Sequence, residues 1–173
     1  MFESKKLLIL MLIFLILCIM PTKTYADDPK IFKHNWYISE TTDPMTDQKT
    51  IVFSNPRIGY NESYRDREML FFRYKNGEFE ILFLVSDGIL DFKDEFQVKY
   101  RIDKETPKIV VCGRGTHYDV LFFRNPINLI KSLYGKSRLV IEYPMRGYTK
   151  QFEVNLTGVD DVIKYLMQEC NLK

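Results

Sequence analysis

Residues 112–119, CGRGTHYD, carry three side-chain types that can act together in catalysis. Cys112 offers a thiol, His117 an imidazole and Asp119 a carboxylate, the groups that activate a thiolate for nucleophilic attack. Such a set works through its geometry, and members this close together on one expected strand rarely face one another. If Cys112 is joined to another cysteine, it has no nucleophilic sulfur at all. The sequence therefore predicts no catalytic residues and a protein that is not an enzyme.

Metal and cofactor sites are not predicted either. Two histidines, His34 and His117, and two cysteines that are expected to pair do not supply the three or four ligands of a zinc site. Gly113 and Gly115 lack the strand-to-helix setting in which glycines cradle a phosphate.

The segment TTDPMTDQK, residues 41–49, places Asp43 and Asp47 close to a proline. Two carboxylates fall short of the roughly six to eight oxygens that calcium takes. Asp-Pro within a Thr/Asp cluster is typical of a turn, where aspartate side chains accept backbone N–H groups. Both aspartates are therefore predicted to be turn residues. Trp36, just upstream, is predicted to anchor the core.

Arg73 in FFRY and the pair Arg101 and Asp103 in YRID form the remaining polar constellation. An arginine among aromatic residues on a strand must either reach water or find a carboxylate. Two alternatives remain open: a structural ion pair across neighbouring strands, or a recognition patch.

The chain begins with a segment typical of export. Lys5 and Lys6 precede an unbroken apolar run at 7–20 and a small-residue site ending at Ala26. This run is shorter than the roughly 20 residues of a spanning helix, so a signal peptide at 1–26 is predicted. An uncleaved anchor is the alternative. Removing 1–26 leaves 22 basic and 22 acidic residues, and this neutral balance gives no electrostatic basis for binding nucleic acid.

After cleavage, Cys112 and Cys170 are the remaining cysteines. An even pair in an oxidising compartment predicts a disulfide. It would join the C-terminal helix to the sheet and stabilise the fold by about 4 kcal/mol in the chain-entropy account.

Residues 27–173 are expected to form one mainly β domain. FQVKYRI, residues 96–102, alternates apolar and polar positions, and Lys75-Asn76-Gly77 is a hairpin signal. Helices are expected at 125–135, with Asn125 as N-cap, and at 157–170, with Thr157 and Asp160 as a capping box. The predicted architecture is an antiparallel β-sandwich or curled sheet with two short covering helices. The expected strands are 36–40, 49–54, 69–74, 78–85, 96–102, 108–112, 117–123, 138–143 and 150–156.

The order of these motifs resembles the VasI/TagO-like family, exported periplasmic accessory proteins associated with type VI secretion. The likeness covers about residues 36–170, and its most specific part is the C-terminal FEVNLTGVDDVIKYLMQEC. Tyr74 departs from the family pattern, which often has a cysteine there, and Cys112 is an addition. The resemblance implies framework roles for Trp36, Asp43, Asp47, Arg73, Arg101, Asp103, Gly158 and Cys170.

These observations favour a non-catalytic periplasmic or secreted protein that binds an envelope protein or a cell-wall component. A secreted enzyme inhibitor and an envelope hydrolase with dispersed catalytic residues are the alternatives. No cofactor, no nucleic acid and, after signal removal, no membrane span are expected. The partner, the oligomeric state and the strand order are not predicted.

Overall fold

The computed structural model describes residues 30–34, 36–56, 68–85, 94–115 and 120–170. The predicted signal peptide at 1–26, with its cleavage site after Ala26, lies outside these residues, and so do His117 and Asp119.

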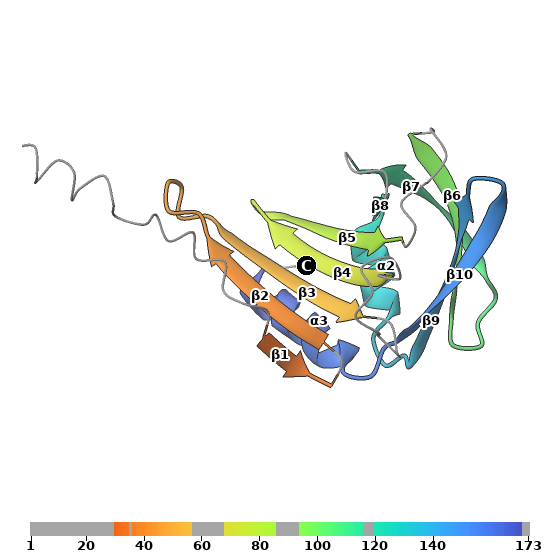
Figure 1. Ribbon diagram of the computed structural model, residues 1–173. Coiled ribbons are helices and arrows are strands. Elements are labelled where there is room, and N and C mark those ends of the chain that lie inside the picture. The colour runs from red at the N-terminus through yellow and green to blue at the C-terminus, as the bar shows by residue number, and fades with distance from the viewer. Residues whose placement is uncertain (1–29, 35, 57–67, 86–93, 116–119, 171–173) are drawn as a thin grey trace, which may run out of the picture.

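Ten antiparallel strands form one strongly curled sheet, with two short helices against it (Figure 1). The strand order is β1-β2-β3-β4-β5-β8-β7-β6-β9-β10. The predicted fold class is thereby confirmed, in its curled-sheet form. The short strand β1 was not among the strands expected from the sequence. The elements are β1 (Lys30–Lys33), β2 (Trp36–Thr42), β3 (Lys49–Pro56), β4 (Met69–Lys75), β5 (Glu78–Leu84), β6 (Glu95–Ile102), β7 (Lys108–Arg114), β8 (Val120–Phe123), α2 (Pro126–Ser132), β9 (Arg138–Met145), β10 (Tyr148–Asn155) and α3 (Val159–Glu169).

Local sequence explains the hairpins and the alternation. Asn76 and Gly77 have φ values of 54° and 82°, and they join β4 to β5 in a two-residue turn that favours these residue types. In β6 the residues Phe96, Val98 and Ile102 are buried, whereas the residues between them are exposed or half-buried. The sheet therefore has an inner face toward the core and an outer face.

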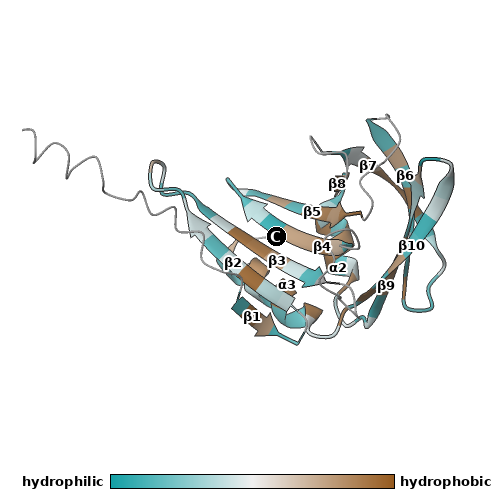
Figure 2. Cartoon of the chain, in the orientation of Figure 1, coloured by the Kyte–Doolittle hydropathy of each residue, from teal (hydrophilic) through white to brown (hydrophobic). Residues whose placement is uncertain are grey.

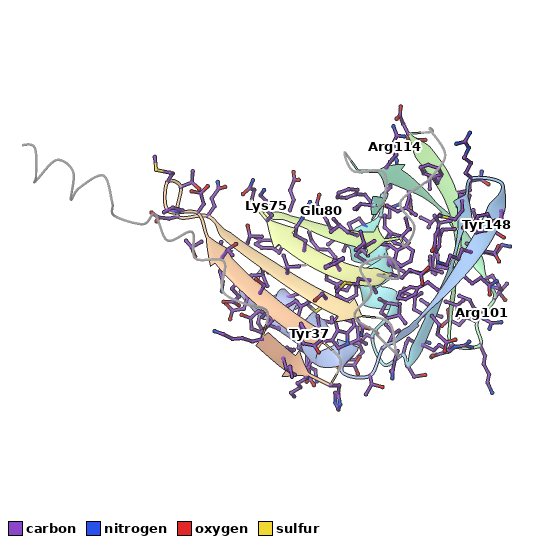
Figure 3. All side chains as sticks on the ribbon, in the orientation of Figure 1. Tyr37, Lys75, Glu80, Arg101, Arg114 and Tyr148 are labelled. Carbon is purple, nitrogen blue, oxygen red and sulfur yellow. The ribbon has the colours of Figure 1, made fainter. Side chains whose placement is uncertain are left out.

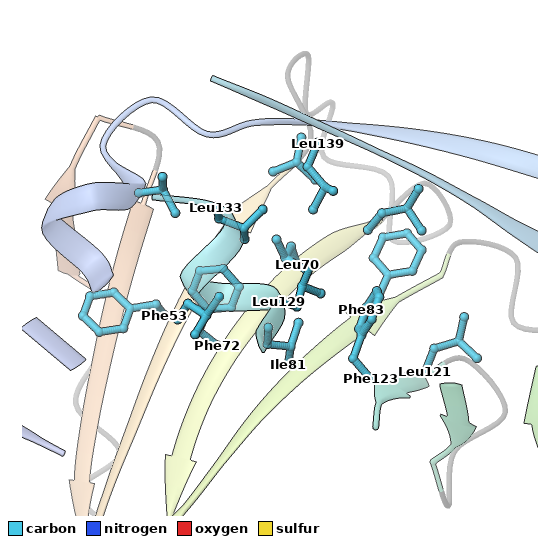
Figure 4. Packing of buried hydrophobic residues seen from close by; sticks show 14 of the residues in the cluster. Phe53, Leu70, Phe72, Ile81, Phe83, Leu121, Phe123, Leu129, Leu133 and Leu139 are labelled. Carbon is cyan, nitrogen blue, oxygen red and sulfur yellow. The ribbon is translucent and has the colours of Figure 1, made fainter. Parts of the chain in front are cut away.

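The curl brings β9 and β10, at one end of the sheet, against β5 in its middle, over a common core. The ring of Phe83 on β5 lies 5.1 Å from that of Tyr143 on β9 and 5.0 Å from that of Phe152 on β10. Leu129 and Leu133, from α2 and the turn after it, pack among the inner residues of β3, β4, β5 and β8 (Figure 4). Trp36 is fully buried and stacks on Phe72 at 5.1 Å, which confirms its role as a core anchor.

A polar contact closes the same junction. Glu68, just before β4, is 1% exposed and accepts a hydrogen bond from the hydroxyl of Tyr143. Its carboxylate also lies 3.3 Å from the ammonium of Lys150 on β10. Because a buried carboxylate requires such partners, this cluster fixes how β4 meets β9 and β10.

Asn125 is the N-cap of α2, as predicted, with Pro126 at the first helical position, but the capping bonds differ from the prediction. Neither Asn125 before α2 nor the residue before α3 makes a side-chain capping bond. The residue before α3 is Gly158, in a left-handed conformation with φ 88°. The Thr157 hydroxyl instead donates to the carboxamide of Asn155, and Asp160 accepts from the Gly135 N–H at 2.7 Å. The predicted Thr157–Asp160 capping box is therefore wrong.

The predicted Cys112–Cys170 disulfide is not formed, and both cysteines are buried free thiols. Cys112 on β7 lies between its strand partners Phe96 and Phe123, in the middle of the sheet. Cys170, at the end of α3, is close enough to Lys49 on β3 for that charge to act on its thiol. In the sheet order, β4, β5 and β8 separate β3 from β7. A disulfide needs Cα atoms within about 7 Å, which this placement does not provide.

Candidate functional site

The predicted ion pair among Arg73, Arg101 and Asp103 is wrong. Arg73 is on β4 and Arg101 on β6, and the sheet places β5, β8 and β7 between these strands. Arg73 instead pairs with Glu80 on β5 at 2.6 Å. Glu80 and Arg101 lie in opposite halves of the molecule (Figure 3). Because the order of the strands is not contained in their local pattern, the sequence could not separate these residues.

Asp103 has a structural role at the end of β6. Its carboxylate accepts hydrogen bonds from the N–H and hydroxyl of Ser137 and from the N–H of Arg138, at 3.1, 2.9 and 2.9 Å. The Ser137 hydroxyl bond, aided by the two backbone bonds, holds the pKa of Asp103 below its ordinary value. Arg101 lies near Glu153, whose pKa is lowered mainly by its bond from Arg138 and to a smaller extent by the charge of Arg101.

Asp43 and Asp47 are confirmed as turn residues. The Asp43 carboxylate accepts the N–H of Met45 at 2.8 Å, and the Asp47 N–H donates to the Asp43 carbonyl at 2.8 Å. Asp47 itself has φ 54°, a conformation that aspartate tolerates. Within the described ranges, no three His, Cys, Asp or Glu residues are grouped so as to hold a metal ion.

Cys112, the sulfur of the catalytic set weighed from the sequence, is fully buried. Burial raises the pKa of its thiol to about 12, so the group is a neutral thiol at physiological pH. A buried neutral thiol is a core side chain and a poor nucleophile.

The outer face of the sheet divides into two chemically different parts. Over β6, β9 and β10 it is polar: Lys99 donates to Glu142 at 2.8 Å, Gln151 donates to Glu142 at 2.8 Å, and Arg138 pairs with Glu153 at 2.6 Å. This is the ordinary solvent-facing side of an antiparallel sheet.

Over one end of β4 and β5, with the adjoining parts of β3 and β8, the outer face is apolar instead. The strand register sets Phe71 beside Leu82 and Leu82 beside Phe122, and one row further sets Met69 beside Leu84 and Leu84 beside Val120. We call this surface the outer apolar face and define it by Val52, Met69, Phe71, Leu82, Leu84, Val120 and Phe122. Strongly hydrophobic segments occur along β3, β4 and β5, whereas β10 carries much hydrophilic surface (Figure 2).

The outer apolar face contains a hollow of about 310 Å³. Val52, Phe71, Leu82, Leu84 and Val120 line it, and Arg73 stands at its border. Most of these side chains are half-buried, because neighbouring strands shield them in part. Apolar side chains gathered around an outer hollow are a common feature of surfaces at which proteins make contacts.

Arg73 is held in place at the border of the hollow. Its Nε and Nη2 both lie 2.6 Å from the same Glu80 oxygen, and its guanidinium carbon lies 5.8 Å from the ring centre of Phe122. A guanidinium stacked on an aromatic ring and bonded to a carboxylate loses little further freedom when another molecule contacts it. The prediction that Arg73 contributes to recognition therefore stays a proposal. The surface on which Arg73 lies was not predicted from the sequence.

The sequence did hold a signal for this surface. MLFFRYK and EFEILFL have apolar residues on both sides of their strands, unlike the alternating EFQVKYRI of β6. A strand that is apolar on both faces is typical of one covered on both faces. In the part of the chain that the structure describes, the two helices lie on the inner face, and no helix lies on the outer one.

No protein-family model, curated protein or solved structure matches this chain. Among the residues that the structure describes, no helix is both long enough and apolar enough to span a membrane.

Proposed function

We propose that this chain is a non-catalytic exported protein of the cell envelope that binds another protein through the outer apolar face. The observation that carries this proposal is the hollow of about 310 Å³ lined by Val52, Phe71, Leu82, Leu84 and Val120. Burying such side chains against apolar side chains of a partner is the usual driving force of association. The export part of the proposal, and the likeness to VasI/TagO-like accessory proteins, rest on the sequence motifs alone.

The charges around the hollow indicate what kind of partner it takes. Arg73 already has Glu80 at 2.6 Å, and the next row across β4 and β5 sets Lys75 beside Glu78. Because Arg73 is paired with Glu80, and Lys75 stands opposite a residue of the other sign, a partner does not need a charge of its own. We therefore propose a partner surface of apolar side chains and binding that changes little with salt.

Substitution of Phe71 tests the proposal. Phe71 is half-buried on the outer face, so Phe71→Ser removes contact surface without opening the core. Val140→Ser is the matched control, since Val140 is a half-buried outer residue of the polar part, beside Glu142 and Gln151. Thermal melts first show that the native protein and both variants are folded. Each is then cross-linked in envelope extract. The protein that the native chain captures is purified, and its binding to all three is measured.

We expect Phe71→Ser to weaken binding of that purified partner by roughly tenfold or more, as central apolar contacts do, and Val140→Ser to leave it unchanged. Affinity is also expected to stay within about threefold when salt rises across the physiological range. Equal binding by all three proteins, or a steep fall of affinity with salt, would overturn the proposal.

A further inference from the structure

A second recess lies on the opposite side of the sheet, between α2 and the inner face of β6 and β7. Its volume is about 450 Å³. Figure 1 shows α2 in the space between the two halves of the curled sheet. This recess is separate from the outer apolar face. Most of its lining lies on the other face of the sheet, and β8 is the one strand that contributes to both, with Phe123 on the inner side and Val120 and Phe122 on the outer side.

The floor of the recess is apolar. Tyr100 on β6, Val110 on β7, Phe123 at the end of β8 and Leu129 on α2 contribute to it. Phe123 and Leu129 are 5% and 6% exposed, whereas Tyr100 and Val110 pack against the core and remain half-buried. The floor of the recess is therefore an edge of the hydrophobic core that solvent can reach.

The border of the recess is polar and rich in hydrogen-bond donors. One face of α2 and the residue before it supply Asn125, Asn128 and Ser132, whose spacing places them on the same side of the helix. The Ser132 hydroxyl donates its proton to the Leu129 carbonyl at 2.6 Å, so the free donors of this border are the two asparagine carboxamides and Lys108. The Asn125 carboxamide makes no capping bond and is exposed.

Lys108, at the start of β7, supplies a cation to this border. Its ammonium lies 3.6 Å from Glu105, beyond hydrogen-bond length, whereas Lys136 bonds the same carboxylate at 2.7 Å. Two lysines thus share the Glu105 carboxylate, and the Asp103 carboxylate also acts on Lys136. Lys108 is the less tightly held of the two and is 55% exposed, so it can turn to a bound anion.

The geometry points to a binding site for a small amphipathic carboxylate in this recess. Its apolar body would cover Tyr100, Val110, Phe123 and Leu129, and its carboxylate would accept from the Lys108 ammonium and the Asn128 amide. Small-molecule sites in proteins typically enclose roughly 300–1,000 Å³, with an apolar lining and a few polar groups that orient the ligand. The recess has this size and this distribution of groups, and a single cation suits a single negative charge.

Decanoate is the probe for this site, with 1-decanol as the same chain without its charge. Both are titrated, below the concentrations at which they aggregate, into the protein comprising residues 27–173. Calorimetry measures the binding. Lys108→Gln removes the cation, and Lys131→Gln is the matched control, because Lys131 is exposed on α2 and does not line the recess.

We expect saturable binding of decanoate at one site, and weaker binding of 1-decanol. Lys108→Gln should weaken decanoate by roughly tenfold, the usual effect of losing a charge-assisted hydrogen bond, and should leave 1-decanol unchanged. Lys131→Gln should bind as the native chain does. No decanoate binding in the millimolar range, or equal affinities in Lys108→Gln and Lys131→Gln, would overturn the assignment.

Decanoate also fits the outer apolar face in principle, and Phe71→Ser separates the two surfaces. Binding that survives Phe71→Ser and falls with Lys108→Gln supports the recess. Binding that is lost with Phe71→Ser and kept with Lys108→Gln overturns it. Neither result depends on whether a protein partner is found.

Discussion

Gly158 lies at a position where both the backbone conformation and the neighbouring atoms disfavour a side chain. Its φ is 88°, and a Cβ there would lie 2.8 Å from the His34 ring and 3.5 Å from Trp36. Glycine therefore serves two purposes: it adopts the left-handed backbone before α3, and it lets β1 and β2 pass close to that turn.

We expect Gly158→Ala to lower the free energy of unfolding by about 2–3 kcal/mol, through backbone strain together with displacement of the His34 ring. Gly135→Ala is the control, because Gly135 has φ 69° and no atoms within 4 Å of its Cβ position. That variant should lose about 1 kcal/mol in urea unfolding. Equal losses in the two proteins would show that the His34 contact has no energetic effect.

Asp103 gives a prediction about pH. The pKa of its carboxyl is lowered in the folded protein by hydrogen bonds from Ser137 and Arg138. A carboxyl with a lowered folded-state pKa stabilises the fold above its unfolded pKa, and that stabilisation is lost as the pH falls through the folded pKa. Asp103→Asn suits the φ of 47° and removes the charge.

We expect the Asp103→Asn protein to be less stable than the native protein at pH 7, and the difference to shrink between about pH 5 and pH 2. Urea midpoints across that range measure it. Asp43→Asn is the comparison, since the Asp43 carboxylate accepts one backbone N–H in an exposed turn. A difference between Asp103→Asn and native protein that stays constant with pH would contradict the role of the Asp103 charge.

At the scale of the element, α3 packs on the sheet through its buried aliphatic residues and through one aromatic residue, Tyr165. The Tyr165 ring lies 5.6 Å from that of Phe32 on β1 and 5.4 Å from that of Phe53 on β3, and its hydroxyl donates to Glu40 on β2. This single side chain therefore contacts three strands.

We expect Tyr165→Ala to destabilise the fold by about 3 kcal/mol, and Tyr165→Phe, which keeps the ring, by about 1 kcal/mol. Tyr134→Ala is the control, because Tyr134 is 51% exposed and should change stability by less than about 0.5 kcal/mol. Chemical denaturation measures all three variants. A Tyr165→Ala loss no larger than that of Tyr134→Ala would show that α3 does not depend on this contact.

The elements themselves were largely predictable, because each depends on neighbours in sequence. The alternation in β6 and the Asn76-Gly77 turn are local patterns with local physical causes. The absence of the Thr157–Asp160 capping box was not predictable, because it depends on a distant contact: Asp160 accepts the Gly135 N–H, and Gly158 takes the place of the expected N-cap. The outer apolar face was visible only as strands without alternation, and its location depended on where the helices pack.

At the scale of the whole molecule, strand order decides which residues meet. β8 pairs with both β5 and β7, and this insertion separates Arg73 from Arg101. The two-residue period of a strand predicts which face of the sheet a residue lies on. It does not predict which strands lie on either side of that strand. The recess beside α2 likewise depends on how far the sheet curls, which is set by long-range contacts such as those of Phe83 with Tyr143 and Phe152.

The separation of the two cysteines predicts their chemical behaviour. Both thiols are buried, and burial raises their pKa values to about 12 for Cys112 and about 11 for Cys170. We expect both to resist alkylation in the native protein and both to react after denaturation without a reductant. Intact mass measures this. Thiols that react only after reduction would show that the oxidised fold differs from the one described.

β10 is the last strand of the described sheet and has a neighbour on one side only. An eight-residue strand with such an edge is a template on which further chains can stack into fibrils. Lys150 counteracts this in the middle of β10, because its ammonium turns inward to the buried carboxylate of Glu68. An inward-pointing charge on an edge strand disfavours pairing with another chain, so the contact that joins Lys150 to Glu68 also makes β10 a poorer template for stacking.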